Sequence, residues 1–292
     1  MEEFKRLSLS DFDILYDFFI KSDKRICDFT PGTAIMWRNF FSTEYAVMSG
    51  SLVFRFNYFG KTAYSYPCGG DETQALKSLL SSDNEIMFCN LTDGDISVLK
   101  KYALISDIND DMSWYDYLYL ADTFKTYAGK KLSGQRNHVN RFNREYPDSH
   151  TEIICESNLL NVRRFYESTV GDGSLTGTAL ADENIVFEVL DNYDKYHQNG
   201  VALFDRDMVI AFSIGENMND TLYAHIEKAN TAYTGAYQKI ASEFVRTFAT
   251  KKTVYLNREE DLGNEGLRKS KQSYHPVDLL KKVTALCKKN NF

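Results

Sequence analysis

The sequence contains no long hydrophobic run. Its longest apolar stretches, such as ILYDFFI, are far shorter than the roughly 18 to 20 residues that span a bilayer. The charged start, MEEFKR, is also unlike a signal peptide. These absences predict a cytoplasmic protein without an integral membrane segment.

Paired cysteines and the commonest catalytic motifs are absent as well. The five cysteines are scattered without a C-x-x-C pair, which favours reduced thiols over a disulfide framework or a zinc site. The five histidines lack H-E-x-x-H spacing and no G-x-S-x-G occurs, so zinc proteases and serine hydrolases are disfavoured and no metal site is predicted. The net charge of −7 disfavours a protein that coats nucleic acid nonspecifically, because its field repels phosphates.

The composition is that of a folded protein. With 292 residues, 43% of them hydrophobic and 26% charged, the chain can bury one large core or two modest ones. In each half the hydrophobic pattern predicts a helix, three strands, a helix, a strand and a helix. We therefore expect an internal repeat of architecture, with an N-terminal domain at residues 1–122 and a C-terminal domain at residues 123–292.

A basic stretch lies at the predicted boundary between the halves. Its cations have no acid among them and are Lys125, Lys130, Lys131, Arg136, Arg141 and Arg144. Spread over a turn and a following helix, they could bind a phosphate-rich ligand, since each cation adds an attraction that salt weakens. The alternative is a solvated helix that packs through Val139 and Phe142.

The predicted strand TLYAHIE carries polar groups suited to chemistry. Strict alternation places Leu222, Ala224 and Ile226 on one face, and Tyr223, His225 and Glu227 on the other. The first face is predicted to join the core and the second to carry functional groups, with His225 as a packed sheet residue.

The apolar residues Ile240 and Phe244 lie at helical spacing and predict a helix after this strand, and this helix could bind an anion at its start. Thr234 is its predicted N-cap, and Gly235 leaves room for close approach. The first N–H groups of a helix lack internal partners and lie at the positive end of its dipole, so a phosphate or an oxyanion at residues 234–237 would be stabilised. A simple capped helix is the alternative.

A glycine-containing segment, GDGSLTG at residues 171–177, could be mistaken for a nucleotide loop. Its spacing is G-x-G-x-x-x-G and it follows a helical segment instead of a strand. It is therefore predicted to be a flexible loop over the cleft.

Three segments together resemble a known family. They are HIEKANTAYTGAYQKIASEF, YLNREEDLGNEGLRKSKQSYHP and AGKKLSGQRNHVNRF, and they are similar to the DUF2156 family, which includes the C-terminal catalytic part of bacterial phosphatidylglycerol lysyltransferases. The resemblance covers mainly residues 117–285, and the spaced motif N-R-E-x-D-L-G-x-x-G-L-R-x-x-K-x-S-Y carries most of it.

The resemblance implies an α+β fold of two tandem N-acetyltransferase-like (GNAT-like) domains. Each would be a mixed, mostly antiparallel sheet flanked by helices. In this superfamily an acyl donor enters where two central parallel strands splay apart, here TLYAHIE and TVYL. The implied function is acyl or aminoacyl transfer to an amine or hydroxyl acceptor, which could be a small molecule, a peptide or a lipid, with no further cofactor required.

The donor is predicted from a departure in the loop before the helix. Users of acetyl-CoA commonly carry Q/R-x-x-G-x-G/A there, whereas ANTAYTGAYQ has Ala232 at the first position and Tyr237 at the last. Aminoacyl-tRNA is therefore the expected donor, because the lysyltransferase-like members take an aminoacyl group from charged tRNA. An acyl-CoA-dependent N-acyltransferase and a noncatalytic metabolite-binding protein are the alternatives.

The resemblance also assigns roles. Glu227 is the expected general base or amine-orienting group, and the Asn257 amide can donate to a carbonyl oxygen and accept from an attacking amine. The predicted substrate-binding residues are Gly235, Ala236, Tyr237, Arg258, Asp261, Arg268, Lys271, Tyr274, Lys130, Lys131, Arg136 and His138. Among them, the arginines suit carboxylate or phosphate, Asp261 suits a turn, and Tyr274 suits the orientation of a neighbour. A salt-bridged surface turn is the alternative for residues 257–271.

Overall fold

A computed structural model describes residues 3–170 and 175–289. The chain divides into two compact units. Unit 1 comprises Met1–Asp116, Glu260–Asn264 and Leu279–Phe292, and unit 2 comprises Tyr117–Glu259 and Glu265–Asp278. The chain thus passes between the units several times, which a single boundary at residue 122 does not describe.

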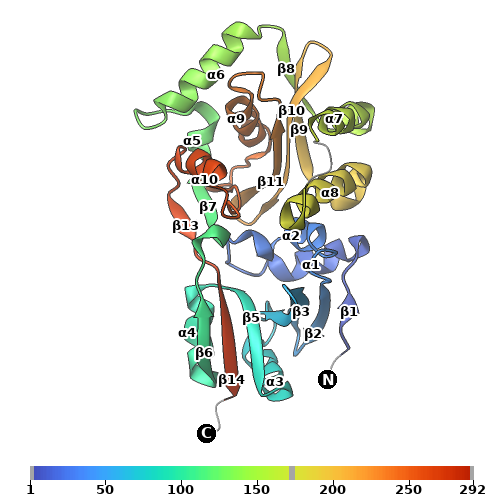
Figure 1. Cartoon of the computed structure of the whole chain (residues 1–292), viewed down its shortest axis with the longest axis vertical. Helices are drawn as coiled ribbons and strands as arrows, with labels where there is room; N and C mark the ends of the chain where they lie inside the picture. Colours follow the sequence, from blue (N-terminus) through green and yellow to red (C-terminus); the bar gives the residue numbers. More distant parts are fainter. Residues whose placement is uncertain (1–2, 171–174, 290–292) are drawn as a thin grey trace. The chain divides into compact units, whose positions relative to one another are not determined.

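Unit 1 contains a seven-stranded sheet in the order β1-β2-β3-β4-β5-β14-β6 (Figure 1). Its strands are β1 (Lys5–Arg6), β2 (Glu44–Met48), β3 (Ser51–Tyr58), β4 (Lys61–Ser65), β5 (Glu85–Leu91), β6 (Ala103–Asn109) and β14 (Val283–Lys289). Its helices are α1 (Phe12–Phe19), α2 (Pro31–Met36), α3 (Glu72–Ser82) and α4 (Asp93–Tyr102). Neighbouring strands are antiparallel except for β4 and β5, which are parallel.

Local sequence explains much of this unit. The β2–β3 turn places Ser49 and Gly50 at φ of 51° and 75°, the left-handed pair that a tight hairpin requires. Helix α4 begins with a capping box between Thr92 and Asp95. The apolar residues of α3 and α4 pack with Val53 in one core cluster, whereas Phe19 of α1 contacts the next residue of β3, Phe54. The helices therefore cover opposite faces of the sheet.

Unit 2 contains a second seven-stranded sheet in the order β13-β7-β12-β11-β10-β9-β8 (Figure 1). Its strands are β7 (Asp116–Leu120), β8 (Ser149–Ile153), β9 (Asn199–Asp205), β10 (Met208–Met218), β11 (Thr221–Ala229), β12 (Tyr255–Asn257) and β13 (Asp278–Leu280). Its helices are α5 (Ala121–Thr126), α6 (Ser133–Glu145), α7 (Glu156–Thr169), α8 (Gly177–Asp191), α9 (Ala236–Phe248) and α10 (Glu265–Gln272). Strands β11 and β12 pair in parallel, whereas the pairs β8–β9, β9–β10, β10–β11 and β12–β7 are antiparallel.

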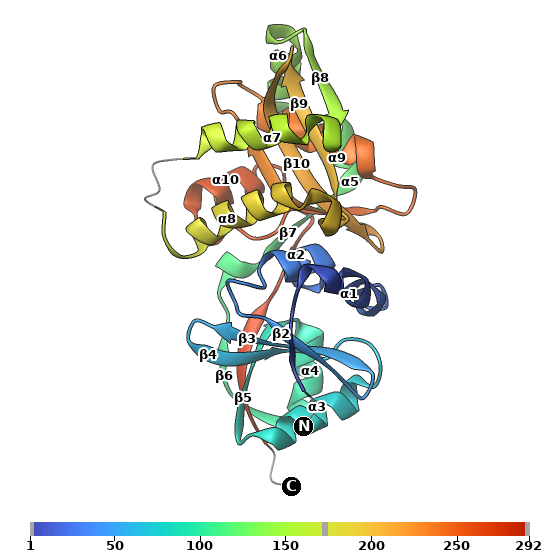
Figure 2. The ribbon, with the colours of Figure 1, turned by 90° about the vertical axis from the view of Figure 1, so that its right-hand side faces the viewer.

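Helices again pack on both faces of this sheet, with α7 on one face and α9 on the other (Figure 2). Tyr166 of α7 contacts the ring of Phe212 on one face. Helix α9 packs on the other through the apolar positions predicted from its helical spacing, among them Ile240 and Phe244. Gly215 is required here, because a Cβ at this position would lie 3.0 Å from the Phe244 ring and 1.8 Å from the Tyr223 carbonyl oxygen.

The predicted repeat of architecture is confirmed, with one feature that the sequence pattern did not predict. Each sheet contains the same order of four antiparallel strands, a parallel strand and two further strands. Strand β7 was expected in the first half, yet it pairs with β12 in the second sheet. Conversely, β14 comes last in the chain and pairs with β5 and β6 in the first sheet. The two halves have thus exchanged one strand each.

Within the two described ranges, no helix has both the length and the apolar character needed to cross a bilayer.

Candidate functional site

The parallel strands of unit 2 separate after a short paired stretch. Strands β11 and β12 pair through Thr221↔Tyr255, Leu222↔Leu256 and Tyr223↔Asn257. Strand β12 then ends, whereas β11 continues to Ala229 beside β10. In the described part of the chain, β11 beyond Tyr223 has no strand partner on this side. The pairing between the two strands therefore covers only the first three residues of β11.

A β-bulge changes the faces of β11 within this opening. In the register with β10, Ile226 pairs with Ile214 and Ala224 pairs with Gly215, so His225 is the extra residue. An extra residue reverses the alternation beyond it. The prediction that Tyr223, His225 and Glu227 share a face is therefore wrong. Glu227 pairs with Ser213 and lies on the face opposite to Tyr223 and its parallel neighbour Asn257.

The bulged His225 lies between two carboxylates. Its Nε2 is 2.9 Å from Glu216 Oε1 and its Nδ1 is 2.7 Å from Glu259 Oε1, and the imidazole is fully buried. Burial alone would lower the pKa of His225, but hydrogen bonds to Glu216 and Glu259 and their charges raise it to about 10. The side chain is therefore an imidazolium at neutral pH. It links β10, β11 and the turn after β12 across the opening.

On the other side of β11, Glu227 forms an ion pair with a buried arginine. Arg258 Nε donates to Glu227 Oε2 at 2.7 Å, and the two side chains are 8% and 12% exposed, respectively. The guanidinium lies 4.6 Å from the ring centroid of Tyr274 and 5.5 Å from that of Phe124. Burial lowers the pKa of Arg258, but the pKa is raised overall, and the negative charge of Glu227 makes the largest contribution to this rise.

This ion pair uses only part of its hydrogen-bonding capacity. Glu227 Oε1 and Arg258 Nη1 are buried and make no hydrogen bond within the described residues. The same holds for the hydroxyl of Ser213, which pairs with Glu227 across the strands. Buried polar atoms without partners are uncommon and costly, so their concentration here indicates a place for a polar ligand group or an ordered water.

Two residues of the recognised motif build the turn after β12. Asn257 is fully buried, and its Oδ1 accepts from the Glu259 amide at 2.7 Å. The buried Lys271 on α10 donates to the carbonyl oxygens of Arg258 at 2.6 Å and Glu259 at 3.2 Å. These contacts orient the Arg258 and Glu259 side chains. Asn257 and Lys271 thus act on the site through the backbone in this structure.

The other motif residues have different environments. In unit 1, the Asp261 carboxylate accepts from the Gly263 amide at 2.9 Å, which forms the turn predicted for it. In unit 2, Tyr274 is buried against Phe124 with its ring stacked at 5.2 Å, and Arg268 on α10 is partly exposed. Tyr274 therefore contributes to the aromatic surroundings of Arg258.

The start of α9 differs from the prediction. The N-cap is Gly235, at φ 93° and without a side-chain cap, and the predicted N-cap Thr234 precedes it. A Cβ at Gly235 would lie 2.5 Å from the His138 carbonyl oxygen of α6. The space beside Gly235, which the sequence suggested for a ligand, is therefore occupied by the α6 backbone. Ala236 is buried, and Tyr237 is 37% exposed.

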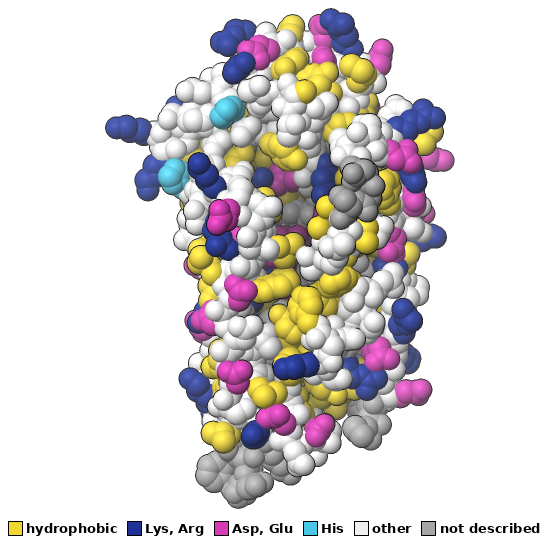
Figure 3. Space-filling model, in the orientation of Figure 1, with side chains coloured by type: hydrophobic (Ala, Val, Ile, Leu, Met, Phe, Trp, Pro, Cys, Tyr) yellow, Lys and Arg dark blue, Asp and Glu magenta, His cyan; other side chains and the backbone are white. Residues whose placement is uncertain are grey.

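The cations of the basic stretch differ in their partners and in their exposure. Lys125 pairs with Asp122 at 2.7 Å, and Arg141 pairs with Glu145 at 2.7 Å, two acids just outside the stretch. Arg136 donates to the carbonyl oxygens of Tyr127 and Gly129. Arg141 is exposed despite its ion pair, and so are Lys130, Lys131, His138 and Arg144. Figure 3 shows the cations spread along α6 and not gathered into one patch.

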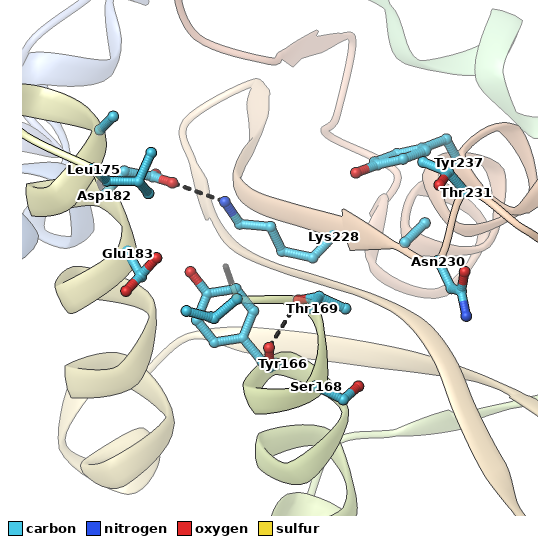
Figure 4. Close-up of a pocket in the computed structure, with 13 residues that line it drawn as sticks. Tyr166, Ser168, Thr169, Leu175, Asp182, Glu183, Lys228, Asn230, Thr231 and Tyr237 are labelled. Atoms are coloured by element: carbon cyan, nitrogen blue, oxygen red, sulfur yellow. Dashed lines mark hydrogen bonds and ion pairs between the residues drawn. The ribbon is translucent and has the colours of Figure 1, made fainter. Parts of the chain in front are cut away.

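A pocket of about 500 Å³ lies at the end of β11. It is lined by α7, α8, the last residues of β11 and the first turn of α9. Lys228 of β11 reaches Asp182 of α8 at 2.7 Å, beside the rings of Tyr166 and Tyr237 (Figure 4). Of the predicted loop at residues 171–177, residues 171–174 lie outside the described residues.

Unit 1 contains a cluster that the sequence did not suggest. Ligand atoms of Cys27, Asp116 and Glu260 lie within 4.8 Å of one another, a spacing that could bind a metal ion. However, the buried Lys282 ammonium lies 2.8 Å from Asp116 and 3.5 Å from Glu260. Burial and the nearby carboxylates raise the pKa of the Cys27 thiol. The lysine already supplies the cation that these carboxylates need.

Comparisons with known proteins identify relatives over nearly the whole chain. The family described as "Phosphatidylglycerol lysyltransferase, C-terminal" matches residues 21–286. An uncharacterized protein of Mycoplasmoides gallisepticum is 27% identical over 179 residues, which are 59% of this chain. The match spans 56% of that protein's own length.

Solved structures show the same fold. A conserved protein of unknown function from Bacteroides thetaiotaomicron is 31% identical, with a TM-score of 0.89 over 99% of this chain and 100% of that one. The C-terminal DUF2156 domain of a putative lysylphosphatidylglycerol synthetase from Agrobacterium fabrum has 12% identity and a TM-score of 0.65, covering 94% and 91%. FemX has 10% identity and a TM-score of 0.56, covering 98% and 95%. The predicted tandem GNAT-like fold is confirmed.

Proposed function

Because the chain belongs to the family of the C-terminal part of phosphatidylglycerol lysyltransferases, we propose that it moves an aminoacyl or acyl group from an activated donor to an amine or hydroxyl acceptor. The opening between β11 and β12 carries this proposal. Strand β12 ends at Asn257, opposite Tyr223, and β11 runs on to Ala229. An extended donor can pair with the edge of β11 beyond the end of β12 and present its carbonyl group in the opening.

The two partnerless atoms of the ion pair supply the chemistry. Arg258 Nη1 donates to the carbonyl oxygen of the donor, where negative charge develops during attack. Glu227 Oε1 accepts a hydrogen bond from the attacking group and orients its lone pair toward the carbonyl carbon. Because both atoms are buried, these interactions act in a medium of low dielectric and are stronger than in water.

The reaction balances without a further cofactor. For an amine acceptor and an ester donor, the nitrogen forms a bond to the carbonyl carbon and the ester carbon–oxygen bond breaks. A neutral amine loses one proton, and the departing alkoxide gains one. Glu227 is the proposed carrier of this proton, as a general base toward the nucleophile and an acid toward the leaving group.

The proposed donor is aminoacyl-tRNA. Support comes from the loop before α9, which lacks the glutamine or arginine common in users of acetyl-CoA, and from the exposed Lys130 and Lys131 before α6. Each exposed cation that neutralises a phosphate contributes a salt-dependent attraction. The expected test is a thermal-shift comparison of CoA with charged tRNA. Stabilisation by CoA together with indifference to tRNA would reverse this choice of donor.

The transfer itself is tested with two variants. Glu227→Gln retains the shape of the side chain but removes the proton acceptor, and Arg258→Lys retains the charge but cannot make the same fork of donors. We expect roughly 100-fold lower kcat for each, since single groups of this kind contribute about that much. The assay follows labelled aminoacyl groups from tRNA to a panel of amines and alcohols.

Folding must be checked in parallel, because Arg258 is buried. Circular dichroism and thermal unfolding distinguish a misfolded variant from an inactive one. The exposed Lys252→Gln variant is the control and should retain full activity. If Glu227→Gln and Arg258→Lys fold and turn over at the wild-type rate, the active site lies elsewhere.

A further inference from the structure

The pocket beside β11 contains one more negative than positive charge. Asp182 and Glu183 on α8 and Lys228 on β11 are the ionisable acids and bases in its lining besides tyrosines. Lys228 Nζ lies 2.7 Å from Asp182 Oδ2, so these two charges neutralise each other. Glu183 is partly buried and makes no ion pair or hydrogen bond among the residues that the structure describes. Its carboxylate is the excess charge.

The spacing on α8 explains why two carboxylates line the pocket. Asp182 and Glu183 lie three and four residues after Ala179, so both are neighbours of Ala179 on the helix surface that lines the pocket. Figure 4 shows Asp182 and Glu183 on the same wall of the pocket, with Lys228 reaching toward Asp182 from the opposite side. The fixed position of Lys228 leaves Glu183 without a cation.

The remaining lining suits the rest of an amine. Tyr166 and Tyr237 supply rings, and an ammonium group near such a ring gains an attraction to its face. Burial and the charges of Asp182 and Glu183 raise the pKa of Tyr166, so its hydroxyl stays neutral at physiological pH. Leu175 and Ala179 provide apolar surface for a short aliphatic chain. The volume of about 500 Å³ fits a ligand of that size.

We infer that this pocket binds the ammonium group of a cationic amine, and that the acceptor of the transfer reaction therefore belongs to the aliphatic amines and not to the phosphate-bearing lipids. A phosphodiester would bring a second negative charge next to Glu183, which an unneutralised carboxylate repels. The inference rests on the proposed transferase function, and it selects among the acceptors that this function allows.

The chemistry for such an acceptor is a single amide-forming step. A primary ammonium releases one proton to solvent and becomes the nucleophile, and its nitrogen forms a bond to the acyl carbon of the donor. The ester carbon–oxygen bond breaks, the nitrogen releases a second proton, and the leaving oxygen takes that proton. In a diamine, one nitrogen can react while the other stays an ammonium beside Glu183.

Binding is tested first, without any donor. The probe is 1,5-diaminopentane, and its uncharged counterpart is 1,5-pentanediol. We expect the diamine to shift the NMR signals of residues that line the pocket and the diol to bind at least 10-fold more weakly, as is typical when a charge-assisted hydrogen bond is absent. Glu183→Gln should weaken the binding of the diamine about 10-fold and leave the binding of the diol unchanged.

The matched control is Glu156→Gln, the same change on an exposed residue of the first turn of α7, whereas the pocket meets the last turn of that helix. It should bind the diamine like the wild type. The inference is overturned if the wild type does not bind the diamine, if Glu183→Gln binds it equally well, or if that variant weakens diamine and diol alike.

Turnover separates this inference from the proposed function. In assays with donor, Glu183→Gln should raise the KM for the diamine about 10-fold while kcat changes less than twofold. If the wild type binds the diamine but transfers nothing to it or to any other amine or alcohol, the transferase proposal fails and the binding site stands. If phosphate-bearing alcohols react faster than amines, or if Glu183→Gln alters only the choice of donor, the pocket does not select the acceptor and the inference is wrong.

Discussion

The His225 bridge predicts an unusual dependence of stability on pH. The imidazolium lies between Glu216 and Glu259 with no exposed surface, and its pKa of about 10 exceeds the ordinary value of 6.5. Below pH 6.5 the ring is protonated in both the folded and the unfolded chain, so its stabilising contribution is fully present. Between pH 6.5 and 10 only the unfolded chain releases the proton, and this contribution declines as pH rises.

The magnitude follows from the shift. One pKa unit corresponds to about 1.4 kcal/mol, so a rise from 6.5 to about 10 corresponds to a contribution on the order of 5 kcal/mol. Replacing His225 with Gln removes the cation between the buried Glu216 and the partly buried Glu259, which costs about 3 to 5 kcal/mol. We therefore expect the free energy of unfolding of His225→Gln to fall by that amount at pH 6.5.

The assay is urea denaturation of wild type and variant at half-unit steps from pH 6.5 to 9.5, followed by circular dichroism. The difference in the free energy of unfolding between wild type and variant should decrease by about 1.4 kcal/mol per pH unit, because the contribution of His225 to the wild type declines. His150→Gln is the control, because His150 is 48% exposed and its ion pair with Glu152 spans 3.4 Å. A gap that stays constant across this range would refute the reasoning, since the ring would then not titrate with a raised pKa.

Two further substitutions test the construction of the site. Gly235→Ala should lower the free energy of unfolding by about 2 to 4 kcal/mol, because φ of 93° is strained for alanine and the new Cβ meets the α6 backbone. The control is Gly129→Ala, where φ is 90° and no atom lies within 4 Å of the new Cβ. In the same urea assay it should lower the free energy of unfolding by only about 1 to 2 kcal/mol. Lys271→Met should cost about 2 to 3 kcal/mol in thermal unfolding and slow transfer, because the turn that carries Arg258 loses its donor; unchanged stability and rate would contradict this.

Sequence reasoning succeeded where the signal is local. The spacing of Ile240 and Phe244 predicted α9 because a helix repeats its apolar face every three to four residues regardless of its surroundings. It failed at β11, because a bulge is decided by pairing with β10 and not by the residues of β11 alone. As a result, the sequence placed Glu227 on the same face as Tyr223, whereas in the structure it lies on the opposite face.

The His225 bridge was missed for the same reason. Alternation made His225 a packed sheet residue, and nothing in TLYAHIE shows which carboxylates it meets. One signal was present: Glu216 is the single charged residue in the mostly apolar run MVIAFSIGENM, and a buried carboxylate needs a partner. The carbonyl contacts of Lys271 are likewise invisible in sequence, because they join positions more than ten residues apart through a turn.

The exchange of β7 and β14 constrains the order of events during biosynthesis. A ribosome releases residues 1–116 long before β14, which lies between β5 and β6. The first sheet can therefore close only when residues 283–289 have left the exit tunnel, whereas the second sheet needs nothing beyond residue 280. The half that is translated first is thus the half that is completed last, and its unpaired β5 edge must wait for the final strand.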